Sequence, residues 1–392
     1  MNDSIEIKDL QMVRDTNKHL YYWMVENGYS ISGGLKFMKE KLIKLTHHVD
    51  DYECMWNGIE DLYIRDSGEK LPPSFFFTLS SFGSFCYMKT PKSDRKRMIA
   101  LGDGRTKQMY EFLAPIVEFE YKHYEYNTYE QAIKKAKTEI DAGYPTVLGA
   151  LDMYYLPYYS KLYHGDHIPF HYVLMVGYND DAQCIYLHDC GRHEVQTLSY
   201  DELCHAWDCS YPGLSKSNTV CTIRMNATKN KYQIAKEAFV KKSELFLNPP
   251  VGFVGRKGMQ KFIKELPKLK DEITKAEYDK VFADMVTFFG TVPTVPNALR
   301  GINEQDEVSF GGGFDKMSRV LHDMGKEYGI ESWLKASACY EEGAIIVADI
   351  TNVIVAYLTG ETDETAVLPK LFTKAMEIIT DGYILLVKTT SC

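Results

Sequence analysis

The sequence lacks a run of about 18 apolar residues, a CxxC pair, an internal repeat and a low-complexity tract. The missing apolar run argues against a membrane-spanning helix. The most apolar segment, residues 343–360, contains Asp349 and Thr351 and therefore indicates a buried helix. The first ten residues have no basic region followed by an apolar run, so we expect no signal peptide and a cytoplasmic protein.

The sequence also has no excess of positive charge. The net charge is −9 and the pI is about 5.7, whereas a nucleic-acid binder usually carries a basic stripe. The longest basic cluster, at residues 92–97, is short and includes Asp94, which is typical of a solvated loop. We therefore expect neither a nucleic-acid partner nor a membrane partner.

The cysteines are nine in number and irregularly spaced. An odd count without CxxC pairs fits reduced, unpaired thiols and gives no zinc-ribbon pattern. We expect most of these thiols to be buried as small apolar groups. No bound metal or other cofactor is expected.

Length and pattern predict two regions in an α+β protein. Residues 1–225 show short apolar runs separated by turn residues, which indicates an antiparallel sheet. Residues 226–232 are polar and resemble a linker, and residues 232–392 are mainly helical by spacing. We expect strands at 144–152, 171–179, 184–190 and 219–225, strand and loop at 74–90, and helices at 128–143, 232–247, 258–268, 275–289, 313–328, 331–341, 343–358 and 366–380.

The segment HYVLMVGYNDDAQCIYLHDC (171–190) predicts a β-hairpin. If Tyr178 pairs with Ala182, His171 faces Asp189 across the two strands. Directly opposed residues have Cβ atoms about 4.5–5.5 Å apart, close enough for a carboxylate to orient an imidazole. A slip of one residue would separate them, so the inference depends on the register.

An oriented imidazole needs a nucleophile, and Cys54 opens a segment with helical spacing, CMWNGIEDLYIR. Thiolate chemistry is favoured where a cysteine lies at a helix N-terminus beside a histidine. The order Cys54, His171, Asp189 matches the papain-like arrangement, in which the cysteine opens a long helix and its partners come from the sheet. The backbone N–H of Cys54 would then supply one oxyanion donor.

Each residue also has a structural interpretation. A lone cysteine is usually a core residue, a histidine on a strand is more often structural, and an aspartate at a strand end is commonly a turn residue. Cys86 is a rival nucleophile, but it follows an aromatic, strand-like run without a helix start. Cys190 adjoins Asp189 and is too close in sequence to serve the same histidine easily.

Several motifs resemble the N-terminal domain of the butirosin biosynthesis protein H family. They are GYPTVLGALDMYYLPY (143–158), PFHYVLMVGYND, IYLHDCG and LSYDEL. SFFFTLSSFGSFCYMK is similar to the family's Gly-rich strand region, and HHVDDYECMWNGIEDLYI is similar to its nucleophile segment. The resemblance covers residues 45–225, and the tail at 232–390 is more weakly similar to the helical domain that commonly follows. That family itself resembles the papain-like bacteriocin-leader peptidases.

The resemblance implies acyl transfer in secondary metabolite biosynthesis in bacteria. An acyl group passes from a thioester, typically on an acyl carrier protein, to the thiol and then to an amine of a small molecule. By position, it makes Cys54 the nucleophile, His171 the base and Asp189 the orienting carboxylate. Asp152 matches a family aspartate whose role is either support or loop capping.

The sequence departs from the family pattern at two points. Cys190 follows Asp189 where the family typically has proline, and the papain-like glutamine that supplies the second oxyanion donor is not evident before Cys54. His48, six residues upstream of Cys54, is the candidate substitute. These departures leave the substrate open.

Three alternatives stay open. A papain-like peptidase or amidohydrolase would use the same three residues with water as acceptor. A metal enzyme would use His164, His167 and His171, or His47, His48 and Asp50, although neither spacing matches a metal signature. A non-catalytic binding protein would keep the fold without turnover.

Two segments also have open roles. The Tyr-rich segment 153–170 either lines an acceptor pocket or packs over the hairpin. The helical region either forms a homodimer, binds a carrier protein or covers the site.

Overall fold

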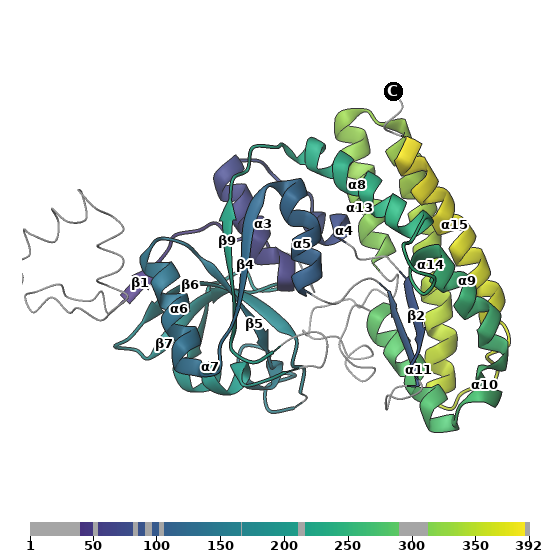
Figure 1. Ribbon diagram of the computed structural model, residues 1–392, viewed down its shortest axis with the longest axis horizontal. Coiled ribbons are helices and arrows are strands. Elements are labelled where there is room, and N and C mark those ends of the chain that lie inside the picture. Colours follow the sequence, from purple (N-terminus) through teal and green to yellow (C-terminus); the bar gives the residue numbers. More distant parts are fainter. Residues whose placement is uncertain are drawn as a thin grey trace, which may run out of the picture.

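The computed structural model describes residues 40–49, 54–80, 85–90, 96–101, 106–165, 167–210, 216–289 and 313–388. The protein is α+β, with an antiparallel sheet in the N-terminal part followed by a helical C-terminal part (Figure 1). None of the described helices is long and apolar enough to cross a membrane.

The main sheet has the strand order β4-β9-β5-β6-β7-β8, and β1 pairs with the far half of β6. These strands are β1 (Glu40–Leu42), β4 (Phe119–Glu125), β5 (Thr146–Leu151), β6 (His171–Asn179), β7 (Cys184–His188), β8 (Gln196–Ser199) and β9 (Thr219–Met225). Strand β6 is buried over nearly its whole length, as its continuous apolar run dictates for a central strand. The predicted strands at 144–152, 171–179, 184–190 and 219–225 are therefore present.

Four longer helices pack around this sheet (Figure 1). They are α3 (Cys54–Ser67), α5 (Thr106–Val117), α6 (Tyr129–Asp141) and α7 (Tyr200–Trp207). The side chain of Thr128 accepts the Gln131 amide at the start of α6, and Gly143 follows its end with a positive φ of 90°. The cap and the terminator predicted for residues 128–143 are both observed.

The aromatic run that begins at Ser74 differs from the expectation of strand and loop. Phe75–Leu79 form a short helix, α4, and all five of its residues are buried. Burial on every side removes the alternation that would distinguish a helix from a strand. The strand in this segment begins later, at β2 (Phe85–Lys89), which pairs with β3 (Arg97–Leu101) in a separate two-stranded sheet.

The helical part begins directly after the polar segment that follows β9. Its elements are α8 (Lys231–Leu247), α9 (Gly255–Glu265), η2 (Leu266–Lys268), α10 (Leu269–Glu272), α11 (Lys275–Phe289), α13 (Phe314–Tyr328), α14 (Glu331–Leu358) and α15 (Leu368–Lys388). The two helices expected at 331–341 and 343–358 are one continuous helix, α14. Gly343 lies inside this helix and does not end it. A Cβ at this position would lie 3.0 Å from Ile379 on α15, so the glycine allows the two helices to pack closely.

The β2–β3 hairpin precedes the helical part in sequence but packs against it, with β2 beside α9 and β3 beside α11 (Figure 1). Phe262 of α9 contacts Phe85 and Tyr87 of the hairpin, with ring centroids 5.8 and 5.2 Å apart. Buried aromatic contacts of this kind hold the hairpin to the helices.

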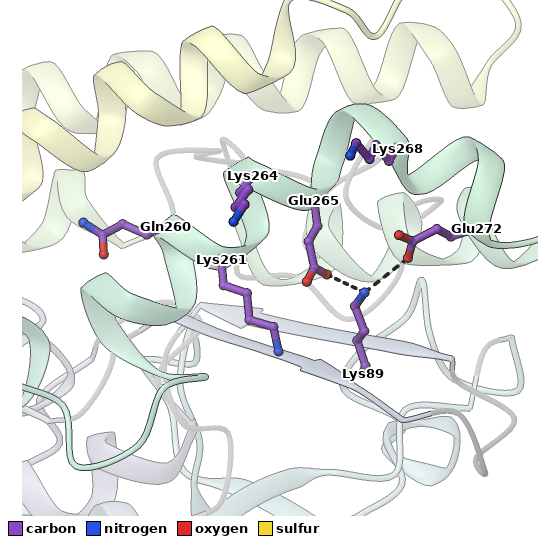
Figure 2. A pocket seen from close by; sticks show the side chains of 7 residues that line it. All are labelled: Lys89, Gln260, Lys261, Lys264, Glu265, Lys268 and Glu272. Atoms are coloured by element: carbon purple, nitrogen blue, oxygen red, sulfur yellow. Dashed lines mark hydrogen bonds and ion pairs between the residues drawn. The ribbon is translucent and has the colours of Figure 1, made fainter.

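Charged side chains line a groove of about 470 Å³ beside the same contact, between β2 and the α9–α10 segment (Figure 2). The amine of Lys89 lies 3.1 Å from Glu265 and 3.2 Å from Glu272. Because these ion pairs are partly exposed, they contribute less to the contact than the aromatic packing does. The residues that line the groove include none of Cys54, His171 and Asp189.

Candidate active site

Cys54 is the first residue of α3 and is half-buried. Two contacts fix this end of the helix. The hydroxyl of Tyr110 donates to the carbonyl of Met55 at 2.5 Å, and the buried ring of Trp56 packs edge-on against Tyr110. Further along α3, a Cβ at Gly58 would lie only 2.5 Å from the Cβ of Leu174. Glycine at this position therefore lets the nucleophile helix approach β6 closely.

His171 and Asp189 meet, although the register predicted for their hairpin is wrong. Leu174 pairs with His188 and Tyr178 pairs with Ile185, with an irregularity between Met175 and Gly177. The turn is therefore longer than a pairing of Tyr178 with Ala182 would allow. In the observed register His171 and Asp189 are diagonal neighbours on one face of the sheet, within reach of long side chains. Nε2 of His171 lies 2.8 Å from both carboxylate oxygens of Asp189.

This contact sets the roles of the imidazole nitrogens. Because Nε2 faces an acceptor carboxylate, it carries the proton, and Nδ1 is the nitrogen left for the thiol of Cys54. Burial by itself lowers the pKa of His171, but the charge of Asp189 and the interaction with Cys54 outweigh burial and raise the pKa above its usual value. The imidazole is therefore basic enough to hold a proton taken from the thiol.

Tyr158 and Tyr159 in the Tyr-rich segment complete the surroundings of the histidine. The hydroxyl of Tyr158 donates to Asp189 Oδ2 at 2.8 Å, and the ring of Tyr159 packs edge-on against His171 with centroids 5.5 Å apart. Both hydroxyl pKa values are raised, first by burial and then by the charge of Asp189. This part of the segment packs over the hairpin end. No feature of the sequence other than its density of tyrosines indicated these roles.

The two supporting candidates lie in different settings. Asp152 caps a short 3-10 helix, η1 (Met153–Tyr155), and its carboxylate also accepts from the Ile168 amide and contacts His167. It therefore holds the ends of the Tyr-rich segment together. The Nε2 atom of His48 lies 3.5 Å from the buried carboxylate of Glu60 on α3.

The other cysteines considered as nucleophiles lie in distinct places. Cys86 is on β2, in the hairpin that packs against the helical part. Cys190 is close to the site, since its sulfur lies within 4.8 Å of ligand atoms of His171 and Asp189. It is 6% exposed, and its thiol lies 3.9 Å from the Tyr159 hydroxyl. The closeness of Cys190 to Asp189 in the sequence therefore does not keep its thiol away from His171.

The first histidine set considered as a metal site, His164, His167 and His171, is not assembled in the part of the chain that the structure describes, and the second set cannot be followed to Asp50. Among the described residues, His167 stacks on Tyr154 and contacts Asp152, while His171 binds Asp189. Asp50 lies outside the described residues. A different cluster, which the sequence did not suggest, brings His47, Asp61 and His188 together beside the site.

Residues 53–190 match the family model described as butirosin biosynthesis protein H, N-terminal. This segment is therefore similar to the N-terminal domain of the butirosin biosynthesis protein H family. The matched segment begins just before Cys54 and includes His171 and Asp189, so it contains the candidate triad, whereas His48 lies just outside it. The family suggests a biosynthetic enzyme of the butirosin type. No curated protein matches the chain.

Proposed function

We propose that the chain is a cysteine-dependent acyltransferase that moves an acyl group from a thioester to an amine of a small natural product. The observation that carries this proposal is the arrangement of Cys54 at a helix start beside His171, whose Nε2 is held by Asp189. The similarity to the butirosin-type domain supports the biosynthetic setting.

In the first half-reaction, His171 takes the thiol proton and the Cys54 thiolate attacks the thioester carbonyl. The C–S bond to the donor breaks, the donor thiol leaves with the proton from His171, and an acyl-Cys54 intermediate remains. The N-terminal end of α3 presents backbone N–H groups to the developing oxyanion. General acid–base assistance of this kind contributes about 10²–10⁴-fold to the rate.

In the second half-reaction, the amine attacks the acyl-Cys54 carbonyl and His171 removes its proton. The bond to sulfur breaks, and the thiolate regains a proton from the imidazolium. The donor in this proposal is an acyl carrier protein or another acyl thioester, and the acceptor is a small amine. Water in place of the amine would make the same site a hydrolase.

Intact mass after incubation with a panel of acyl thioesters tests the proposal. We expect wild type to gain one acyl group that maps to Cys54 and is discharged by added amines. Cys54→Ala should gain none, whereas Cys190→Ala, which removes the neighbouring thiol, should still be acylated. Acylation should persist in a chelator.

Other outcomes would redirect the assignment. Discharge by water at the same rate with and without amines would favour the hydrolase. An adduct on Cys190 rather than Cys54 would overturn the choice of nucleophile. No adduct, together with no selective alkylation of Cys54 by a thiol reagent, would favour a binding protein.

A further inference from the structure

Asp61 is a buried carboxylate on the nucleophile helix, seven residues after Cys54 and therefore two turns along α3. Its Oδ2 atom lies 2.8 Å from Nδ1 of His47 and 2.7 Å from Nδ1 of His188. Its Oδ1 atom accepts the backbone amide of His48 at 2.5 Å. One carboxylate thus joins the segment before the helix, the helix itself and the end of strand β7.

His47 extends this connection to the candidate triad. Its Nε2 atom lies 3.1 Å from the backbone carbonyl oxygen of Asp189, the residue whose carboxylate holds His171. The rings of His47 and His188 lie against each other, with centroids 4.3 Å apart. A continuous set of contacts therefore runs from Asp61 through His47 to Asp189, and from there to His171.

The protons in this cluster can be counted from its acceptors. Nδ1 of His47 faces a carboxylate and Nε2 faces a carbonyl, and both of these groups only accept. Both nitrogens must therefore donate, which makes His47 an imidazolium. Its charge is balanced by Asp61, as burial of a charge requires.

The groups that face His47 agree with this count. They are Asp61 from α3, and His188 and the main chain of Asp189 from the end of β7. Burial lowers the pKa of His47, but the hydrogen bond and charge of Asp61, together with the contact to Asp189, outweigh burial and raise it.

Two histidines and an aspartate are also common metal ligands. The N···O separations of 2.7 and 2.8 Å, however, are hydrogen-bond lengths. Two ligands at about 2.0–2.1 Å from a tetrahedral metal would lie roughly 3.3 Å apart. The distances favour protons between these groups.

We propose that protonated His47 is a positioning residue, which fixes the main chain of Asp189 relative to the nucleophile helix through Asp61. This inference rests on the proposed function for its catalytic consequence, but its structural part does not. When His47 loses one proton, one of its ring nitrogens presents a lone pair to an oxygen that can only accept. The hydrogen bond to Asp61 or to the Asp189 carbonyl is then lost.

The structural part is tested by ¹⁵N chemical shifts of the histidine side chains of wild-type protein, assigned with His47→Gln. At neutral pH we expect both nitrogens of His47 to be protonated. In Asp61→Asn, His47 should become neutral at a lower pH than in wild type. A neutral His47 in wild type at pH 7, or one equivalent of tightly bound metal in the purified protein, would overturn the proposal.

The catalytic part is tested with His47→Gln and a matched control, His123→Gln, which removes another partly buried histidine facing a carboxylate, Glu125. We expect His47→Gln to lower kcat by up to about 10²-fold, the cost of a small misplacement of catalytic groups. KM should be unchanged, and the part of the alkaline limb that comes from deprotonation of His47 should be absent from the pH–rate profile of the variant. The control should match wild type.

The two proposals fail in different ways. If wild type forms no acyl-enzyme, the acyltransferase proposal fails, and the rate of Cys54 alkylation against pH replaces turnover as the readout for His47→Gln. If the acyl-enzyme forms and His47→Gln has the wild-type kcat and pH profile, the positioning role fails alone. The wild-type ¹⁵N spectrum decides the protonation of His47 even if Asp61→Asn does not fold.

Discussion

The sheet region and the helical region bury different kinds of side chain. Around β6 and α3 the buried groups include Asp61, His171, His188 and Asp189, all hydrogen-bonded to one another or to nearby backbone. In the helical region the buried set is mainly aliphatic and aromatic. Its buried side chains among the described residues also include two lysines, Lys242 and Lys316. Buried polar groups are costly unless they are paired. The buried and paired polar groups of the sheet region therefore gather at the candidate site, whereas the helical region is held together mainly by apolar packing.

If this division is right, removing a charge in the sheet region should affect chemistry more than stability. Asp189→Asn should lower the rate of acyl transfer by about 10²–10⁴-fold, because His171 loses its orienting charge. The charge of Asp189 raises the pKa of His171, so the variant should have a lower pKa and its alkaline limb should move to lower pH. Steady-state rates against pH would measure both effects.

The helical region offers a matched control for that substitution. Asp279 also accepts a tyrosine hydroxyl, from Tyr357 at 2.7 Å, just as Asp189 accepts from Tyr158. Asp279→Asn should leave both the rate and its pH profile unchanged. A comparable loss in the two variants would show that the effect at Asp189 is structural.

Removing packing in the helical region should have the opposite result. Phe262 is fully buried between the hairpin ring of Tyr87 and Phe372 of α15. Phe262→Ala should lower the free energy of unfolding by about 3–5 kcal/mol, as large-to-small changes at buried aromatics do. Urea unfolding followed by circular dichroism would measure the loss. Acylation of Cys54 in the fraction that stays folded should be retained, and its loss would show that the helical region contributes directly to the site.

The sequence was informative where local pattern determines structure. Strand β9 and helix α11 have the bounds expected from their residues, and Thr128 caps α6 as its position indicated. Local pattern failed where tertiary packing decided the outcome. The aromatic run of α4 has no polar face, and Gly343 is a contact between helices rather than a break.

The candidate site shows the same limit. Contact between His171 and Asp189 could be expected from a hairpin, yet the register used to argue it was wrong, because the irregularity near Gly177 and the longer turn are not visible in the pattern. The cluster of His47, Asp61 and His188 joins three segments, and Asp61 and His188 are 127 residues apart in the sequence. No local spacing indicates such a cluster, and only the fold brings its members together.

The smallest expected effect is the pH dependence of stability that comes from Lys242. It tests whether the helical region buries a charge. Lys242 is fully buried on α8, where its amine donates to the carbonyl of Thr78 at 2.6 Å, and burial lowers its pKa to about 7. The unfolded chain keeps the ordinary value of about 10.4. Between these two values the unfolded state holds a proton that the folded state has released, so stability should rise with pH by up to about 1.4 kcal/mol per unit.

Lys242→Met should remove this slope, and Lys241→Met, which changes the exposed neighbour paired with Glu237, should keep it. The raised pKa of His171 gives a slope of the opposite sign, because its stabilisation is full below about pH 6.5 and is lost as pH rises through the folded pKa. That contribution is common to all three proteins and cancels when unfolding free energies are subtracted at pH 7.5, 8.5 and 9.5. Equal slopes in wild type and Lys242→Met would mean that the amine stays protonated in the folded state. The helical region would then bury a true charge, and the contrast with the sheet region would be weaker than the structure indicates.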